Sequence, residues 1–142
     1  MLNFSTLTKE DRDLISAAEG LISKLFEHEK HHVAAALRTK SGKIFTAVNI
    51  ETYVNRISVC AESIVIGKAI SEGEKEFDTI VAVRHPCPDE RETQIKVVSP
   101  CGMCREVICD YGPDSSVIIP YDDRIVKCDI GELLPVKYKR HE

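Results

Sequence analysis

Two stretches of the chain place apolar residues at helical spacing, with different patterns around the helix. Thr8, with Asp11 three positions later, is typical of a helix start with an acidic first turn. The apolar residues that follow lie on one helical face: Leu14, Ala18, Leu21, Ile22 and Leu25. Residues 60–71, which end before Gly73, form a second predicted helix that is apolar on most sides. Such a helix is buried from more than one direction, so we expect a partner subunit to cover part of it.

Shorter apolar runs predict strands between and after these helices. Residues 33–37 and 44–48 are expected to form a hairpin, because Ser41 and Gly42 supply turn chemistry between them. The remaining predicted elements are a buried strand at 80–83, a surface loop at 84–94 and a helix at 101–111. Two strands at 117–119 and 125–126 and a last turn at 130–134 follow. Alternating strands and helices predict a single three-layer α/β domain over residues 1–142, with helices on both faces of the sheet.

Composition and charge narrow the class of partner. The 142 residues include 43% hydrophobic and 30% charged residues, which is ordinary for a globular domain. Lys and Arg number 19 against 23 Asp and Glu, giving a net charge of −4, and the basic residues are scattered. Nucleic-acid-binding proteins normally carry a basic stripe, so we expect no nucleic-acid partner.

The sequence also bears on the compartment. No apolar run approaches the roughly 20 residues that span a bilayer, and residues 9–13 are charged where a signal peptide would be apolar. We therefore expect a cytoplasmic protein without a membrane partner. In a reducing cytoplasm, the six cysteines need a role other than disulfide formation.

Cys60, Cys101 and Cys104 form the strongest chemical signal. Cys101 and Cys104 have Cys-x-x-Cys spacing, which places two thiolates on one turn, and Cys60 supplies a third at the start of a different predicted helix. Three protein ligands leave the fourth position of a tetrahedral zinc ion open, as in catalytic zinc sites. Glu62, two residues from a ligand, is placed to take a proton from a water there and pass it to a leaving amine.

Other interpretations of the cysteines stay open at this point. The Cys-x-x-Cys pair is also found in redox sites, and a closed structural zinc site would take a fourth ligand from Cys87, Cys109, Cys128 or His85. Otherwise we expect Cys109 and Cys128 to be small core residues and Cys87 to be a free thiol in a charged loop. The histidines lack ligand spacing with the cysteines and are expected at surface or strand-edge positions. They are His28, His31, His32, His85 and His141.

The negative charge of such a thiolate centre predicts a positively charged residue close to it. Three thiolates on Zn²⁺ leave a net negative charge that opposes ionisation of a water, so a positive group is expected nearby. Arg105, next to Cys104, and Arg56 are the candidates to offset it.

Asn49 and Glu51 follow the predicted strand 44–48. Side chains two positions apart in an extended segment point the same way. Their amide and carboxylate would suit the vicinal hydroxyls of a sugar, and Phe45 would line the same pocket. Solvated loop residues are the alternative interpretation of this pair.

Taken together, these motifs resemble the cytidine deaminase superfamily over nearly the whole chain, from His32 to Pro135. The likeness is carried by Cys-Ala-Glu at 60–62, by His-His-Val-Ala-Ala-Ala at 31–36, by Val-Arg-His-Pro at 83–86 and by Val-Ser-Pro-Cys-Gly-Met-Cys-Arg-Glu at 98–106. Typical small cytidine deaminases have an arginine where this chain has Ser63, and the sequence is most similar to the bacterial blasticidin S deaminase branch.

The resemblance implies a fold, a cofactor and a site. The fold is a three-layer α/β/α cytidine deaminase-like fold with a mixed five-stranded sheet, assembled as a homotetramer. One Zn²⁺ per subunit is held by the three cysteines, with Glu62 as proton shuttle. In the family, the backbone at Ala61 and the serine at Ser99 hold the base, and Asn49 and Glu51 contact the ribose.

The expected function is hydrolytic deamination of the 4-amino group of a small cytosine nucleoside, with release of ammonia. Cytidine, deoxycytidine and the nucleoside antibiotic blasticidin S are the candidate substrates, in pyrimidine salvage or antibiotic resistance. Two alternatives are a polynucleotide-editing cytosine deaminase, which requires a basic groove and stacking aromatic residues, and a non-catalytic oligomer stabilised by zinc. Only 6% of the residues are aromatic and none is tryptophan, which disfavours the former.

Overall fold

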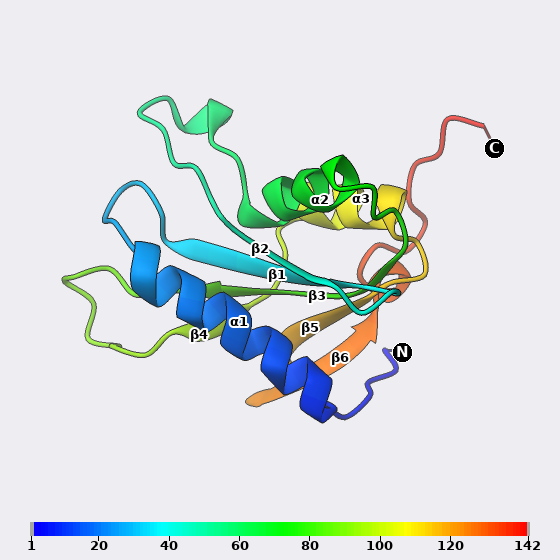
Figure 1. Cartoon of the computed structure of the whole chain (residues 1–142), viewed down its shortest axis with the longest axis horizontal. Helices are drawn as coiled ribbons and strands as arrows, with labels where there is room; N and C mark the ends of the chain where they lie inside the picture. The colour runs from blue at the N-terminus through cyan, green and yellow to red at the C-terminus, as the bar shows by residue number, and fades with distance from the viewer. Residues whose placement is uncertain (1, 142) are drawn as a thin grey trace.

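The computed structural model, which describes residues 2–141, places helices on both faces of one mixed sheet (Figure 1). The strand order is β2-β1-β3-β5-β6, and β4 pairs with β3 off this path. In chain order the elements are α1 Lys9–Leu25, β1 Val33–Thr39, β2 Ile44–Val48, η1 Asn55–Ile57, α2 Ala61–Ser71, β3 Phe77–Arg84, β4 Lys96–Val98, α3 Gly102–Tyr111, β5 Ser116–Tyr121, β6 Arg124–Asp129 and η2 Ile130–Leu133.

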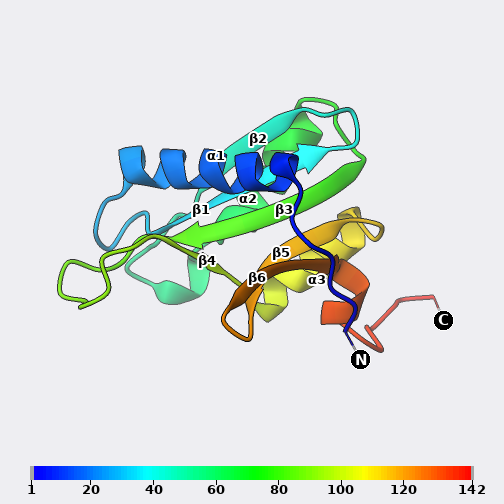
Figure 2. The ribbon, with the colours of Figure 1, turned by 90° about the horizontal axis from the view of Figure 1, so that it is seen from below.

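The helix α1 begins and packs as its sequence predicts. Thr8 is the N-cap, and its side chain accepts a hydrogen bond from the backbone N–H of Asp11 while the Asp11 carboxylate accepts one from the N–H of Thr8. The apolar face of α1 packs on one side of the sheet, across β1 and β3 (Figure 2). Leu14, Ala18 and Ile22 are fully buried there.

Antiparallel and parallel pairs both occur in the sheet. The predicted hairpin is present: β1 and β2 pair antiparallel, with Ala35 opposite Ala47 and Leu37 opposite Phe45. Gly42 in the connecting turn has φ +94°, a conformation that glycine adopts without steric cost. Strand β3 pairs antiparallel with β1 and parallel with β5, and α3 lies in the crossover between β3 and β5.

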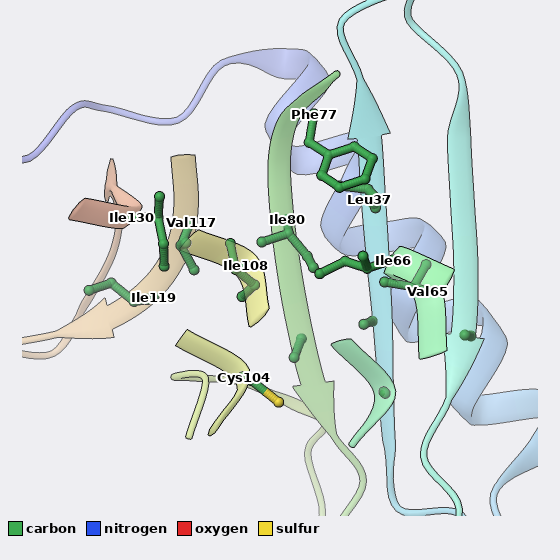
Figure 3. Close-up of a cluster of buried hydrophobic side chains, with 14 of the residues drawn as sticks. Leu37, Val65, Ile66, Phe77, Ile80, Cys104, Ile108, Val117, Ile119 and Ile130 are labelled. Atoms are coloured by element: carbon green, nitrogen blue, oxygen red, sulfur yellow. The ribbon is translucent and has the colours of Figure 1, made fainter. Parts of the chain in front are cut away.

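The other face of the sheet is covered by α2 and α3. Their buried residues interdigitate with alternate strand residues such as Leu37 and Ile80, in the core cluster shown in Figure 3. Cys104 of α3 belongs to this cluster and is only 1% exposed. The cysteine-bearing ends of α2 and α3 are therefore fixed to the sheet by the main hydrophobic core.

The sheet contains one strand more than the five that were expected. The extra strand, β4, pairs antiparallel with β3 over Ala82–Arg84, whereas β5 pairs with β3 only at Thr79 and Ile80. Strands β4 and β5 therefore pair with the same edge of β3, each along a different part of it.

No helix within residues 2–141 has the length and apolar character needed to cross a membrane.

Candidate metal centre and active site

Three cysteine thiols meet where α2 and α3 begin. Cys60 and Cys101 are the N-cap residues of the two helices, both in extended conformation, and Cys104 lies in the first turn of α3. The Sγ atoms of Cys60 and Cys101 are 3.8 Å apart, and the sulfur atoms of all three residues lie within 4.8 Å of one another. The predicted cysteine trio is thus brought together from two helices.

The spacing and chemistry of this trio fit zinc. A Zn–S bond of about 2.3 Å gives a tetrahedral edge of about 3.8 Å between ligand sulfurs. Both helix N-termini direct backbone N–H groups and positive dipole ends toward the thiols, which favours thiolate. Within residues 2–141 no fourth His, Cys, Asp or Glu joins this group, so the set is the open, three-ligand type.

Burial makes two of the three thiols hard to ionise on their own. It raises the pKa of Cys60 and, more strongly, that of Cys104, where the Glu62 carboxylate adds to the effect. For Cys101 burial acts in the same direction, but hydrogen bonds from the Cys104 backbone N–H and from neighbouring thiols outweigh it and lower the pKa. A divalent cation is the natural compensation for three thiolates packed this closely.

Glu62 lies in the first turn of α2 beside the cysteines, and it is 6% exposed. Burial raises the pKa of its carboxyl above the usual value, against opposing contributions from its own backbone N–H and from the Cys104 thiol. A carboxyl whose pKa is moved toward neutrality is suited to taking up a proton and releasing it again.

A cavity of ≈ 230 Å³ opens beside these residues. Its lining includes Glu62, Cys60 and Cys101, together with Asn49, Ala61 and Ser99. The other lining residues, which no catalytic or ligand motif in the sequence singles out, are Val33, Ser58, Val59 and Val98. Val98 ends β4, so the short strand missed in the sequence is what carries Ser99 to the cavity.

Asn49 is held in one orientation by the backbone. Its Oδ1 accepts hydrogen bonds from the N–H groups of His32 (2.8 Å) and Val33 (3.0 Å), and its own N–H donates to the Val33 carbonyl. The Oδ1 end of the amide is therefore fixed by β1, and the Nδ2 group is the end that can donate to a ligand.

Glu51 and Phe45 lie outside this cavity. Glu51 lines a neighbouring cavity of ≈ 490 Å³, and the two cavities share Asn49 and Ser58. Phe45 packs against the main core cluster, and it is not among the residues that line the 230 Å³ cavity. Four residues along a strand span about 13 Å, which places Phe45 well away from the end of β2 where Asn49 follows.

Neither arginine that was expected to offset the thiolate charge, Arg105 or Arg56, has a side-chain hydrogen bond to a sulfur of the trio in the described residues. Arg105 Nε donates to the Pro100 carbonyl (2.9 Å) and its Nη1 to the Leu133 carbonyl (3.2 Å). Arg105 thereby ties the turn that carries Cys101 to η2. We expected it to offset the thiolate charge, but its hydrogen bonds go to these carbonyls and not to a ligand sulfur. Arg56 is exposed in η1. The planar guanidinium fork of Arg105 reaches both carbonyl groups at once, one just before α3 and the other in η2.

Comparison with known proteins places this geometry in context. Residues 8–119 match the family model of the cytidine and deoxycytidylate deaminase zinc-binding region. The chain is 54% identical to blasticidin-S deaminase of Bacillus cereus over 135 residues, covering 95% of this chain and 96% of that protein. The crystal structure of cytidine deaminase from Burkholderia pseudomallei superposes with a TM-score of 0.73 at 27% identity, covering 93% of this chain and 100% of that one. The cytidine deaminase structure from Bacillus anthracis shares the fold, with a TM-score of 0.76 at 24% identity over 92% and 90% of the two chains.

Proposed function

Because this chain belongs to the cytidine and deoxycytidylate deaminase family, we propose that it hydrolyses the 4-amino group of a cytosine nucleoside or of blasticidin S and releases ammonia. The observation that carries the proposal is the open trio of thiols with the buried Glu62, beside a cavity that Cys60, Cys101 and Glu62 help to line. The extent and level of identity to a blasticidin-S deaminase support the antibiotic as a substrate alongside cytidine and deoxycytidine.

In this proposal Cys60, Cys101 and Cys104 hold one zinc ion per subunit. Zinc there supplies a Lewis acid that activates water for attack on the carbon bearing the amino group. Glu62 takes up the proton that the water loses and delivers it to the amino nitrogen, which then leaves as ammonia. Burial of Glu62 supports this role, since the carboxyl holds and returns a proton without competition from bulk water.

The remaining polar residues orient the substrate. We assign the base to the wall formed by the backbone at Ala61 and by Ser99, beside the thiols. We assign the sugar hydroxyls to the Nδ2 group of Asn49 and, at the border of the adjoining cavity, to the carboxylate of Glu51. A nucleoside so placed presents its amino-bearing edge to Glu62.

A direct assay tests the reaction. Zinc-loaded protein is incubated separately with cytidine, deoxycytidine and blasticidin S, and with a single-stranded oligonucleotide that contains cytosine. Ammonia release and the change in pyrimidine absorbance are followed. We expect turnover of at least one of the three small molecules and none of the oligonucleotide. Turnover of the oligonucleotide alone would instead indicate a polynucleotide-editing enzyme.

The Asn49→Asp variant tests the sugar contact separately. Aspartate keeps the oxygen that accepts from the His32 and Val33 N–H groups but removes the Nδ2 donor. One net hydrogen bond contributes about 0.5–1.5 kcal/mol, so we expect kcat/KM to fall by up to about tenfold, mainly through KM, in a protein that stays folded. An unchanged kcat/KM in steady-state assays would remove Asn49 from the substrate site.

We also propose that the chain works as a homotetramer in the cytoplasm. Large apolar side chains lie exposed on and around η1, including Tyr53, Val54 and Ile57, and a partner subunit would cover them. All six cysteines are free thiols, which a reducing compartment preserves. Light scattering coupled to gel filtration tests the assembly, and a monomeric mass at micromolar concentration would contradict it.

A further inference from the structure

A second cluster of metal-ligating side chains lies outside the cysteine trio. Potential ligand atoms of His28, His32 and Cys87 all lie within 4.8 Å of one another. The Sγ of Cys87 and the Nδ1 of His32 are 3.9 Å apart, and the rings of His28 and His32 have centroids 5.3 Å apart. We propose that His28, His32 and Cys87 form a binding site for a second thiophilic divalent cation such as Zn²⁺, distinct from the cysteine trio.

The fold holds these three residues together by pairing the segments that carry them. The backbone N–H of His85 donates to the His32 carbonyl (2.7 Å), continuing the β1–β3 ladder beyond Val33 and Arg84. Cys87 follows two residues later, at the same end of the sheet. Approach of the two segments is therefore set by the sheet and does not depend on a bound ion.

Aromatic packing and a tight turn hold the histidine side of the cluster. The ring of Phe26 stacks on His85, with centroids 3.8 Å apart, and meets His32 edge-on at 5.2 Å. Glu27 and His31 pair across the turn that presents His28, and Glu29 within it has φ +68°. The His28 ring meets His32 edge-on, while its side chain stays 47% exposed and open to an incoming ion.

The distances require only small movements on metal binding. A Zn–S bond of about 2.3 Å and a Zn–N bond of about 2.0 Å place ligand sulfur and nitrogen about 3.5 Å apart in a tetrahedron. The Cys87 Sγ and the His32 Nδ1 are 3.9 Å apart. On binding, the Cys87 S–H proton leaves to solvent and a sulfur–metal bond forms. Two neutral imidazoles and one thiolate leave one tetrahedral position for water, and a divalent ion then gives the set a charge of about +1.

Neighbouring side chains can support both kinds of ligand. Arg84 Nη2 donates to the Cys87 sulfur at 3.4 Å while it pairs with Glu90, and donors of this kind stabilise metal-bound thiolates. The Nε2 of His32 now accepts from the Glu29 N–H, which keeps the ring proton on Nδ1. When Nδ1 binds the metal, that proton moves to Nε2, and the Glu29 N–H gives up its hydrogen bond to the ring. The Glu51 carboxylate, 3.8 Å from Nε2, accepts the proton after a small approach.

The site lies beside the candidate active site. All three ligands line the 490 Å³ cavity that shares Asn49 and Ser58 with the cavity of the cysteine trio. An ion held there would tie the turn after α1 to the loop after β3 at the mouth of that cavity.

Metal stoichiometry tests the proposal on the full chain. Metal-stripped protein is dialysed first against excess Zn²⁺ and then against a metal-free buffer that contains a weak chelator of known zinc affinity, which removes loosely bound ions. The number of zinc ions bound per chain is then measured. Titration with Co²⁺ adds a spectroscopic signature, since each thiolate-containing site contributes sulfur-to-cobalt absorption. We expect two ions per chain in the wild type and one in Cys87→Ser and His28→Ala. The control Cys109→Ser, a cysteine outside both groups, should still bind two.

The variants also separate this proposal from the proposed function. Cys101→Ser should lose the ion of the cysteine trio and keep the one at His28, His32 and Cys87. If Cys87→Ser fails to fold, His28→Ala decides, because its exposed ring can be removed without opening the core. One ion per wild-type chain, or two ions in a folded His28→Ala variant, would overturn the second site and leave the deaminase proposal standing.

Discussion

The Arg105 side chain binds the backbone that presents the cysteine trio. Its guanidinium joins the Pro100 carbonyl, just before α3, to the Leu133 carbonyl of η2. It holds in place the chain that carries Cys101 and Cys104. We therefore expect Arg105 to position the cysteine ligands, and a change at Arg105 to lower the affinity for zinc.

Replacing Arg105 with Lys tests this positioning role. A lysine retains the charge but cannot reach both carbonyls with a planar fork. We expect zinc affinity to fall by about tenfold or more, the range seen when groups that orient metal ligands are changed. Competition against a chromogenic chelator measures it. Arg91→Lys, in the exposed loop before β4, is the matched control, and equal affinities for the two variants would show that Arg105 does not position the site.

Single residues also show where the sequence was informative. Cys60, Cys101, Cys104 and Glu62 were predictable because short motifs at helix starts fix their positions locally. The grouping of His28 and His32 with Cys87 was not, since it depends on the antiparallel pairing of β1 with β3, across more than fifty residues. Phe45 was misplaced because alternation gives the face of a strand but not the distance along it to the cavity.

Secondary-structure elements were predictable where their ends carry local signals. The helix α1 has a capping box and a regular apolar face, and the hairpin has turn residues between two alternating runs. Strand β4 has neither: it is three residues long, follows a charged loop and begins with the exposed Lys96. Its existence comes from pairing with the part of β3 that β5 does not reach, which is tertiary information.

The capping box of α1 gives a prediction for this helix. Thr8→Ala removes the side-chain oxygen that accepts from the Asp11 N–H. Loss of an N-cap of this type costs about 1 kcal/mol of unfolding free energy, which equilibrium denaturation in urea can measure. Thr6→Ala, an exposed threonine before the helix, should leave the free energy of unfolding nearly unchanged. A similar loss in both variants would contradict the capping assignment.

The layers of the molecule are joined on the α1 side by a buried charge network. Asp11 is fully buried, and its carboxylate contacts Arg38 Nη2 of β1 at 2.9 Å and Lys127 Nζ of β6 at 2.8 Å. Burial alone would raise the pKa of Asp11, but hydrogen bonds from Lys127, from the Thr8 N–H and from Arg38 hold it well below the usual range. One carboxylate thus connects a helix to two strands at different places in the sheet.

This network makes stability depend on pH. Because the pKa of Asp11 is lower in the folded than in the unfolded protein, its contribution is present at neutral pH and is lost as the pH falls below about 4. Asp11→Asn leaves the largely buried Lys127 ammonium without its carboxylate and leaves Arg38 with Asp78 alone, and we expect a loss of about 3 kcal/mol at pH 7. The difference from wild type should shrink on acidification. Thermal unfolding of Asp13→Asn, whose partner Lys9 is exposed, supplies the control, and a pH-independent difference for Asp11→Asn would argue against the network.

In the proposed reaction, proton transfer is assigned to Glu62, which is buried beside the thiols. The decisive measurement compares zinc content and ammonia release for wild type, Glu62→Gln and Glu72→Gln, the last an exposed glutamate at the other end of α2. We predict equal zinc in all three, full activity in Glu72→Gln, and a rate lower by about 10²–10⁴-fold in Glu62→Gln. Undiminished ammonia release from a zinc-replete Glu62→Gln protein would contradict the assignment of proton transfer to this carboxyl.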